Sequence, residues 1–182
     1  KCPYCREPVP KTDEDVNHNY MERVKVNDPV ALCEMGKKCM EEENSEGAFE
    51  YWSKAAELGN IEAHYNLSVF YCMGEAGVEK DMKRAVRHAE EAAIAGHHLA
   101  RYNLGCVENA SRRIDRAGKH FIIAAKLGVD EALEAMKKSF ACGEASKDDY
   151  ASALRGHQAA VDAMKSEQRE EAEEFYKRFT AG

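Results

Sequence analysis

The sequence has no long apolar run and no cluster of basic residues. No stretch of its 182 residues approaches the ~20 apolar residues that a membrane span requires, so we expect no membrane partner. The net charge is -7 at pH 7, and charges of opposite sign alternate along the chain. Because neutralising a phosphate backbone takes clustered Lys and Arg, we also expect no nucleic-acid partner.

Sequence motifs for catalysis are also missing. No Gly-rich phosphate loop follows a strand, no His-Glu-x-x-His motif occurs, and no Ser or Cys nucleophile motif stands out. No segment has the pattern of a β-strand. We therefore expect no catalytic residue and no bound cofactor in these residues. An independent hydrolase or redox enzyme is therefore the least favoured of the functions that the sequence suggests.

The seven cysteines do not indicate a disulfide framework. Their number is odd, their positions are irregular, and several fall in apolar helical stripes, where a reduced Cys behaves as a small hydrophobic residue. Cys33 and Cys39 lie at different angles around a helix, which favours packing over a redox pair. These features predict a reducing compartment, the cytoplasm or the nucleus. Because the chain begins with Lys rather than Met, we expect a fragment of a longer protein, and a targeting signal can lie before Lys1.

What the sequence does contain is a repeated segment. Ala63-His64-Tyr65-Asn66-Leu67-Ser68 returns 37 residues later as Ala100-Arg101-Tyr102-Asn103-Leu104-Gly105. An Ala-Ala pair precedes a Gly by the same distance in three places, at Ala55-Ala56, Ala92-Ala93 and Ala124-Ala125. Periods in this range are typical of helix pairs that stack and share a core with their neighbours. The predicted fold is all-α, an α-α superhelix that winds as a right-handed solenoid of antiparallel helix hairpins.

The helix starts align at Ala31, Ala63, Ala100 and Ala132, and they set the boundaries of the repeats. Residues that accept backbone N-H groups precede several predicted helices, as Asp28 does before Pro29. The predicted organisation, in chain order, is a connecting helix over residues 11–27, repeats over about 28–60, 61–97 and 98–129, a partial repeat over 130–141, and capping helices over 142–182.

Small residues recur inside the first helix of each pair. Gly36, Ser68 and Gly105 occupy equivalent positions, where Gly is less favourable than Ala by ~1 kcal/mol in a helix interior. A sequence keeps a Gly with this penalty where two helices must approach closely. We expect the facing contacts in the second helices to be Ala48, Ala85 and Ala117.

The second repeat carries a more specific signature. Residues 63 to 105 resemble the Sel-1-like repeat, which is similar to the tetratricopeptide repeat, through Leu67, Ser68, Tyr71, Gly74, Gly77-Val78, Asp81, Ala85, Ala92-Ala93, Gly96, Ala100, Leu104 and Gly105. The Gly-x-x-Gly-Val-x-x-Asp turn distinguishes this pattern from a generic helical repeat. The resemblance implies an adaptor for other proteins, with no chemistry of its own.

The resemblance also implies where a partner binds. First helices of tetratricopeptide-like hairpins line the concave side of the superhelix. Asn amides can bond an extended peptide backbone in both directions, and Tyr offers flat area with a polar tip. The predicted partner-binding residues on this face are Tyr65, Asn66, Val69, Tyr102 and Asn103. The alternative is that the Tyr residues pack between repeats and the Asn residues are solvated.

A second resemblance lies at the start of the chain. Lys1-Cys2-Pro3-Tyr4-Cys5-Arg6 resembles the closing knuckle of a RING finger, in which two Cys supply the last two of eight zinc ligands. It implies that residues 1–10 are the remnant of a RING-type zinc finger and that Cys2 and Cys5 bind zinc only together with ligands outside this chain. The intact parent would then be a ubiquitin ligase that recruits substrates through its repeats and binds a ubiquitin-conjugating enzyme through the RING. The alternative is two exposed thiols without a metal.

His97 and His98 fall in the connection between two repeats. Neighbouring side chains in a turn rarely converge on one metal ion without a third ligand. A solvated turn is therefore the favoured interpretation.

Overall fold

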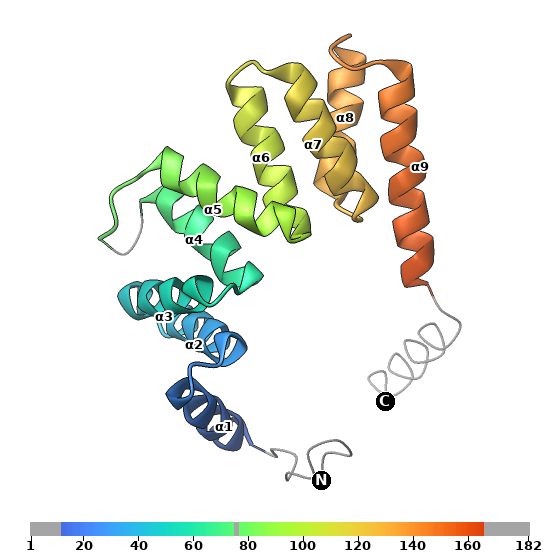
Figure 1. Cartoon of the computed structure of the whole chain (residues 1–182). Helices are drawn as coiled ribbons and strands as arrows, with labels where there is room; N and C mark the ends of the chain where they lie inside the picture. The colour runs from blue at the N-terminus through green and yellow to red at the C-terminus, as the bar shows by residue number, and fades with distance from the viewer. Residues whose placement is uncertain (1–11, 75–76, 166–182) are drawn as a thin grey trace. The chain divides into compact units, whose positions relative to one another are not determined.

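The computed structural model describes residues 12–74 and 77–165, and these residues are all-α, with consecutive helices packed as antiparallel hairpins (Figure 1). The predicted all-α fold of hairpins is therefore confirmed. Cys2 and Cys5, and the helix predicted after Ser166, lie outside the described residues. None of the described helices is long and apolar enough to cross a bilayer.

The chain divides into two compact units, Lys1–His97 and His98–Gly182, and each has its own core. The helices of the first unit are α1 (Asp13–Lys25), α2 (Pro29–Glu41), α3 (Ser45–Glu57), α4 (Ile61–Met73) and α5 (Met82–Ile94). Those of the second unit are α6 (His98–Ala110), α7 (Ile114–Lys126), α8 (Asp130–Ala141) and α9 (Lys147–Met164).

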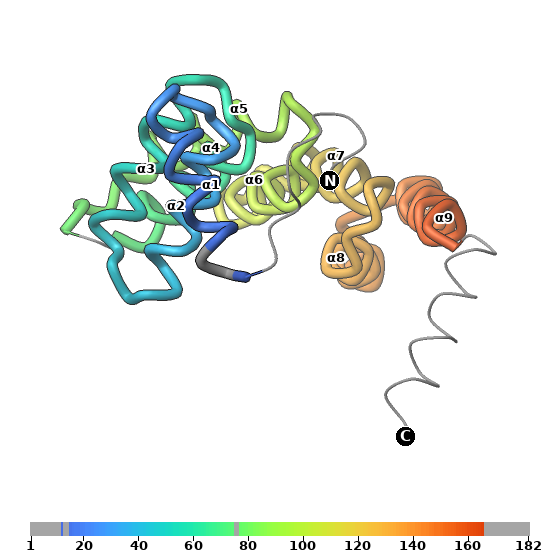
Figure 2. The backbone as a smooth tube through the Cα atoms, turned by 90° about the horizontal axis from the view of Figure 1, so that it is seen from below, coloured from blue at the N-terminus to red at the C-terminus, as the bar shows by residue number. Residues whose placement is uncertain are grey.

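The three hairpins α2–α3, α4–α5 and α6–α7 are each packed closely along their length. The closest pairs are α2 with α3, α4 with α5, and α6 with α7, and the α6–α7 pair is also visible in the perpendicular view (Figure 2). In the second unit, α7 packs against both α8 and α9. In the first unit, α3 also packs against α4, so the hairpins α2–α3 and α4–α5 share one core.

Side-chain caps set many of the helix starts. Thr12 and Asp15 form a capping box at α1, and the Asp28 carboxylate accepts bonds from the amides of Val30 and Ala31 at α2. At α4, the Asn60 side chain accepts from the Ala63 amide and donates to the Pro29 carbonyl, at 3.2 Å. Asn60 thus caps one helix and ties it to the preceding hairpin.

Gly36 and Gly105 of the first helices face aromatic rings, which the prediction of Ala48 and Ala117 as the facing contacts did not include. A β-carbon at Gly36 would lie 2.5 Å from Trp52 Cδ1, and one at Gly105 would lie 2.5 Å from Phe121 Cε1. The two alanines are buried one turn earlier in the same second helices. The aromatic ring occupies the space over each Gly because only a residue without a β-carbon leaves room for it.

The second hairpin solves the same problem with smaller side chains. Ser68 stands in the position of the glycines, and its hydroxyl donates to the Tyr65 carbonyl at 2.6 Å. Ala89, also buried, aligns with Trp52 and Phe121 in the repeat. A larger first-helix residue is thus matched by a smaller second-helix residue.

Candidate functional site

The second unit has a groove between the first helices of successive hairpins, which we call the acidic groove. It has a volume of about 510 Å³ and lies along α6 and α8, with Phe121 of α7 among its lining residues. Its lining includes four carboxylates and one amine, contributed by Asp130, Glu131, Glu134, Glu144 and Lys138. The groove therefore combines an aromatic surface with an excess of negative charge.

Tyr102 and Phe121 supply the aromatic part of the acidic groove. Their ring centroids are 5.8 Å apart, and the rings are tilted by 43°. A hydrogen bond with Cys106, together with burial, raises the pKa of Tyr102. Its hydroxyl group therefore stays protonated at neutral pH and can donate a hydrogen bond as well as accept one.

Two of the carboxylates have partners at the edge of the groove. The Asp130 carboxylate contacts His157 Nε2 at 2.7 Å, and Glu134 pairs with Lys137 at 3.5 Å. Both carboxylates remain largely exposed, at 84% and 58% of their side-chain surface. Exposed pairs of this kind contribute little stability, so these charges are available to a partner.

The predicted partner-binding residues lie on two helices. Tyr102 lines the acidic groove, whereas Asn103 is half-buried on the same helix and is not one of the residues lining it. Tyr65, Asn66 and Val69 are half-buried on α4 in the first unit. The binding role of these five residues stays a prediction.

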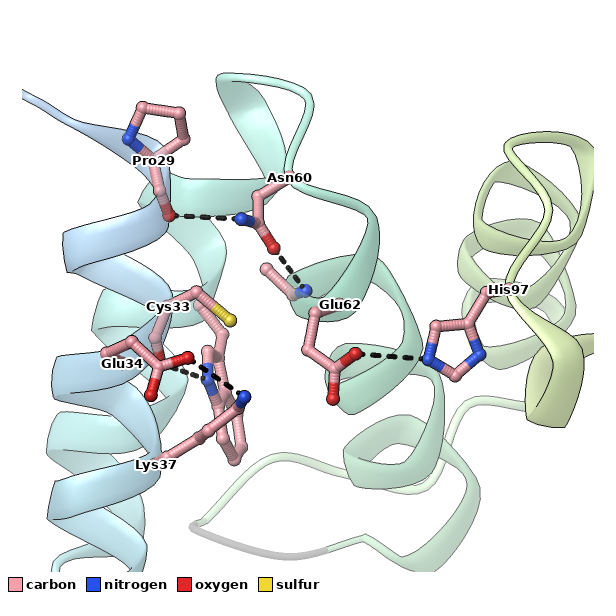
Figure 3. A network of polar contacts seen from close by, with 9 residues as sticks. Pro29, Cys33, Glu34, Lys37, Asn60, Glu62 and His97 are labelled. Atoms are coloured by element: carbon pink, nitrogen blue, oxygen red, sulfur yellow. Dashed lines mark hydrogen bonds and ion pairs between the residues drawn. The ribbon is translucent and has the colours of Figure 1, made fainter. Parts of the chain in front are cut away.

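The first unit carries a polar network along its first helices, α2 and α4 (Figure 3). Glu62 of α4 points toward His97, with Oε2 and Nε2 3.2 Å apart. The Tyr65 ring stacks on His97 at 4.3 Å between centroids and 17° between planes. The His97 side chain is only 8% exposed, so the predicted solvated turn is wrong for this residue. It is held by stacking on Tyr65 and by contact with the Glu62 carboxylate, neither of which the local sequence reveals.

A second pocket lies between α4 and α5 and is lined by side chains of different charge. We call it the His–Arg pocket. It has a volume of about 420 Å³ and is lined by His64, Tyr71, Arg84, Arg87, His88 and Glu91. The Nδ1 atoms of the two histidines are 3.0 Å apart. The Tyr71 ring stacks on His88 at 5.6 Å, and the Arg84 guanidinium lies 5.5 Å from the centre of the Tyr71 ring.

The cysteines of the described residues are free thiols in different surroundings. Cys33 and Cys39 are buried, while Cys106 and Cys142 are exposed, and both of the exposed thiols line the acidic groove. Burial raises the pKa of the Cys33 thiol to about 11, which makes it a packing residue. Within residues 12–74 and 77–165, no three His, Cys, Asp or Glu side chains are grouped so as to hold a metal ion.

Sequence reasoning missed the acidic part of the groove and the His–Arg pocket. The carboxylates of α8 belong to the partial repeat, which keeps the helix start at Ala132 but carries acidic side chains at Asp130 and Glu134, where the second and third repeats have none. Arg84, Arg87, His88 and Glu91 have the i, i+3, i+4, i+7 spacing of one helix face. That polar stripe is the signal that could have pointed to the pocket.

Comparison with known families identifies the repeats. The family model described as Sel1 repeat matches residues 31–60, 61–97 and 98–129. These segments contain the hairpins α2–α3, α4–α5 and α6–α7. The matched residues cover more than half of the chain.

Individual relatives share the repeats over part of their length. The chain is 33% identical over 84 residues to chitin synthase regulatory factor 4 of Schizosaccharomyces pombe, which covers 46% of this chain and 13% of that protein. A solved Sel1 repeat protein from Oxalobacter formigenes is 26% identical with a TM-score of 0.71, over 85% of this chain and 66% of its own. An immunity protein of Pseudomonas aeruginosa, 17% identical over 84% of this chain and 62% of its own, has the same fold with a TM-score of 0.62.

Proposed function

Because this chain belongs to the Sel1 repeat family, we propose that it is a non-catalytic scaffold that binds a basic peptide segment of a partner protein in the acidic groove. Sel1 repeats generally mediate protein–protein interactions, and this general role comes with the family. The observation that carries the finer proposal is the groove of about 510 Å³ between α6 and α8. Its volume is within the 300–1,000 Å³ that is usual for binding pockets, in order of magnitude.

Charge selects the class of peptide. Four carboxylates and a single amine line the groove, and the whole chain carries a net charge of -7. Complementary charge steers a basic segment toward such a surface and disfavours an acidic one. Tyr102 and Phe121 offer flat apolar area for one anchoring side chain of the peptide, as aromatic residues do at the centre of many interfaces.

The two exposed thiols of the groove provide a direct test. The full chain, with Cys2→Ser and Cys5→Ser, is alkylated with and without a synthetic peptide that carries four Lys or Arg around one aromatic residue. Bound peptide is expected to slow alkylation of Cys106 and Cys142, which line the groove, and to leave Cys72 of the first unit unchanged. Equal protection by a peptide in which Glu replaces the basic residues would contradict the charge argument.

Charge reversal in the groove gives a matched comparison. Glu131→Lys with Glu134→Lys is expected to abolish the protection, because it makes the lining of the groove basic. Glu57→Lys with Glu90→Lys changes the net charge equally at exposed positions of the first unit. If both double variants lose the peptide alike, the partner senses only net charge, and the groove is not the binding site.

The predicted partner-binding residues of the concave side are a further part of this proposal. Tyr65 and Asn66 of the second repeat recur as Tyr102 and Asn103 in the third, Val69 lies on the same helix as Tyr65 and Asn66, and Tyr102 also lines the acidic groove. Replacing both Asn66 and Asn103 by Ala is expected to abolish capture of a bound partner while helicity is retained. Unchanged capture of the partner by this double variant would remove these residues from the proposal.

The substrate-recruiting part of a RING-type ubiquitin ligase is the second candidate. It rests on the Cys2-Pro3-Tyr4-Cys5 motif alone, since the matched repeats begin at residue 31. Zinc content and ubiquitin transfer, measured on a longer protein that includes the residues before Lys1, would test it. Stoichiometric zinc that is lost on Cys2→Ser is the expected result, and a protein without zinc would contradict this candidate.

The compartment is proposed from the thiols. We propose the cytoplasm or the nucleus, where thiols stay reduced, because Cys33 and Cys39 are buried as free thiols inside a helical core. The name of the fungal relative describes a regulatory factor of an enzyme. A regulatory scaffold without catalysis agrees with that description.

A further inference from the structure

We propose that the His–Arg pocket of the first unit binds a phosphoryl group carried by a partner protein. The pocket is built from one hairpin, with His64 and Tyr71 from α4 facing Arg84, Arg87 and His88 from α5. These side chains bring guanidinium, imidazole and phenol donors to a single cavity of about 420 Å³. Glu91 is the one carboxylate among the lining residues.

The positive charge of the pocket is only partly neutralised. Arg84 lies over Tyr71 and pairs with Asp81 at 3.5 Å, yet its side chain remains 64% exposed. Arg87 is exposed and forms no ion pair with any residue of the described part of the chain. The whole chain has a net charge of -7, so an arginine without an acidic partner is uncommon on its surface. The Arg87 guanidinium, at the edge of the cavity, is therefore available to bind an anion.

The histidine pair adds donors that an anion would use. With Nδ1 atoms 3.0 Å apart, one ring donates to the other in the free protein. Burial lowers the pKa of His88, and the nearby His64 and Arg87 lower it further. Protonation of the pocket is therefore unfavourable until a negative group enters it. A group with two negative charges compensates the positive charge of the pocket best.

The number and type of donors favour a phosphoryl group over a carboxylate or a membrane surface. A phosphoryl group has three acceptor oxygens and a charge of about -1.5 to -2, and guanidinium groups bind it in a bidentate manner. A carboxylate has two oxygens and would use fewer of these donors. Anionic membranes are recognised by clusters of about 4 to 8 basic residues, whereas two arginines line this pocket.

This inference rests on the proposed scaffold function only in assigning the phosphoryl group to a protein. The His–Arg pocket lies within the first unit and the acidic groove within the second. Phosphate binding and basic-peptide binding can therefore be measured separately. Loss of one would leave the other proposal standing.

The test is a titration of the full chain with inorganic phosphate and with a phosphoserine peptide, followed by NMR of the imidazole signals and by calorimetry. We expect the signals of His64 and His88 to shift with saturation, whereas those of His18, which is outside the pocket, stay in place. Arg87→Gln should weaken binding about tenfold, since it removes a charge-assisted hydrogen bond. Glu91→Gln should strengthen binding about two- to fivefold, because it removes the opposing charge.

Arg155→Gln on α9 is the matched control, because it removes an exposed arginine outside the pocket. Both affected residues of the pocket are exposed, and circular dichroism of each variant verifies that it is folded. Unchanged imidazole signals, or equal effects of Arg87→Gln and Arg155→Gln, would overturn the inference. Equal affinity for a glutamate-containing peptide would reassign the pocket to carboxylates, and binding only to phosphoinositide vesicles would reassign it to membranes.

Discussion

Phe121 covers Gly105 so closely that a β-carbon at residue 105 would lie 2.5 Å from Cε1 of the ring. The same arrangement joins Gly36 and Trp52 in the first hairpin, where the indole nitrogen also donates to the Cys33 carbonyl at 3.1 Å. An aromatic ring against a glycine thus lets two helices approach without leaving a void. The stability of each hairpin should depend on the size of both members of the pair.

Gly105→Ala is expected to lower the free energy of unfolding by about 1–3 kcal/mol, because the added methyl group overpacks the contact with Phe121. Elsewhere in a helix the same substitution is favourable by about 1 kcal/mol. Gly118→Ala in α7 is the matched control, since nothing lies within 4 Å of a β-carbon at that position. Urea unfolding measures both variants, and equal stabilisation of both would contradict the prediction.

A double variant tests the coupling between the two residues. Gly105→Ser with Phe121→Ala copies the pair Ser68 and Ala89 of the second hairpin. We expect the double variant to lose less unfolding free energy than the two single variants lose together. The smaller side chain at residue 121 leaves room for the serine at residue 105, and that serine fills part of the space left by the ring. Additive effects would show that the two positions do not act as a pair.

The spacing of small residues was sufficient to predict the hairpins but not their contacts. The repeats of Ala63 and Ala100 fix which helix face is buried, and the all-α fold follows from that. Ala117 and Phe121 lie one turn apart on the same buried face, so the sequence pattern does not separate them. The crossing of α6 over α7 decides which of the two covers Gly105.

The candidate sites were less predictable than the fold. Tyr102 was identified because it repeats Tyr65, and it lines the acidic groove. Of the α8 carboxylates of the groove, Glu131 aligns with Glu62 in the repeat, whereas Asp130 and Glu134 have no acidic counterpart in the second and third repeats. His97 contacts Glu62, which is 35 residues away in sequence, and no local rule predicts that pairing. Contacts between residues that lie far apart in the sequence therefore need the structure.

Glu108→Gln is expected to lower the free energy of unfolding by about 1–3 kcal/mol, since the charged partners of a buried group would be lost. The Glu108 side chain is 10% exposed, and its carboxylate pairs with Arg113 and with Arg116, the latter at 3.0 Å. No side-chain cap bonds the start of α7, so these pairs hold the turn between α6 and α7. Chemical unfolding at pH 7 provides the measurement. Glu134→Gln, which removes one exposed pair, should change stability by less than about 0.5 kcal/mol.

Acid should reduce the difference between wild type and Glu108→Gln. The hydrogen bond from Arg113 lowers the pKa of Glu108 below its ordinary value of 4.5. A carboxyl group with a lowered pKa contributes stability above that ordinary value and loses it as the pH falls through the lowered one. A difference in stability that stays constant down to pH 3 would contradict this assignment.

Thiol reactivity should separate the described cysteines into two classes. Cys106 and Cys142 are exposed, whereas Cys33 is buried and its pKa is raised to about 11. Because the thiolate is the reactive form, iodoacetamide at pH 8 should modify the exposed pair first. Mass spectrometry of digested protein gives the order. Early modification of Cys33 in folded protein would show that the first hairpin opens.

His88 should make the first unit sensitive to mild acid. Burial lowers its pKa from the ordinary 6.5, His64, Arg87 and Arg84 act in the same direction, and Glu91 opposes them. A histidine with a lowered pKa binds more protons when unfolded, so its contribution is complete above pH 6.5 and is lost as the pH falls through the lowered value. Thermal unfolding between pH 7.5 and 5.5, in a buffer without phosphate, should therefore show a falling midpoint.

His88→Gln separates this titration from the rest of the protein. The variant loses the ring that stacks on Tyr71 and should melt below wild type at pH 7.5. It has no imidazole at residue 88 to protonate, so its midpoint should fall less steeply between pH 6.5 and 5.5. Adding phosphate should raise the wild-type midpoint most at the acid end of this range, since an anion in the His–Arg pocket compensates the charge of protonated His88. Parallel pH profiles of wild type and His88→Gln would place the acid sensitivity elsewhere in the chain.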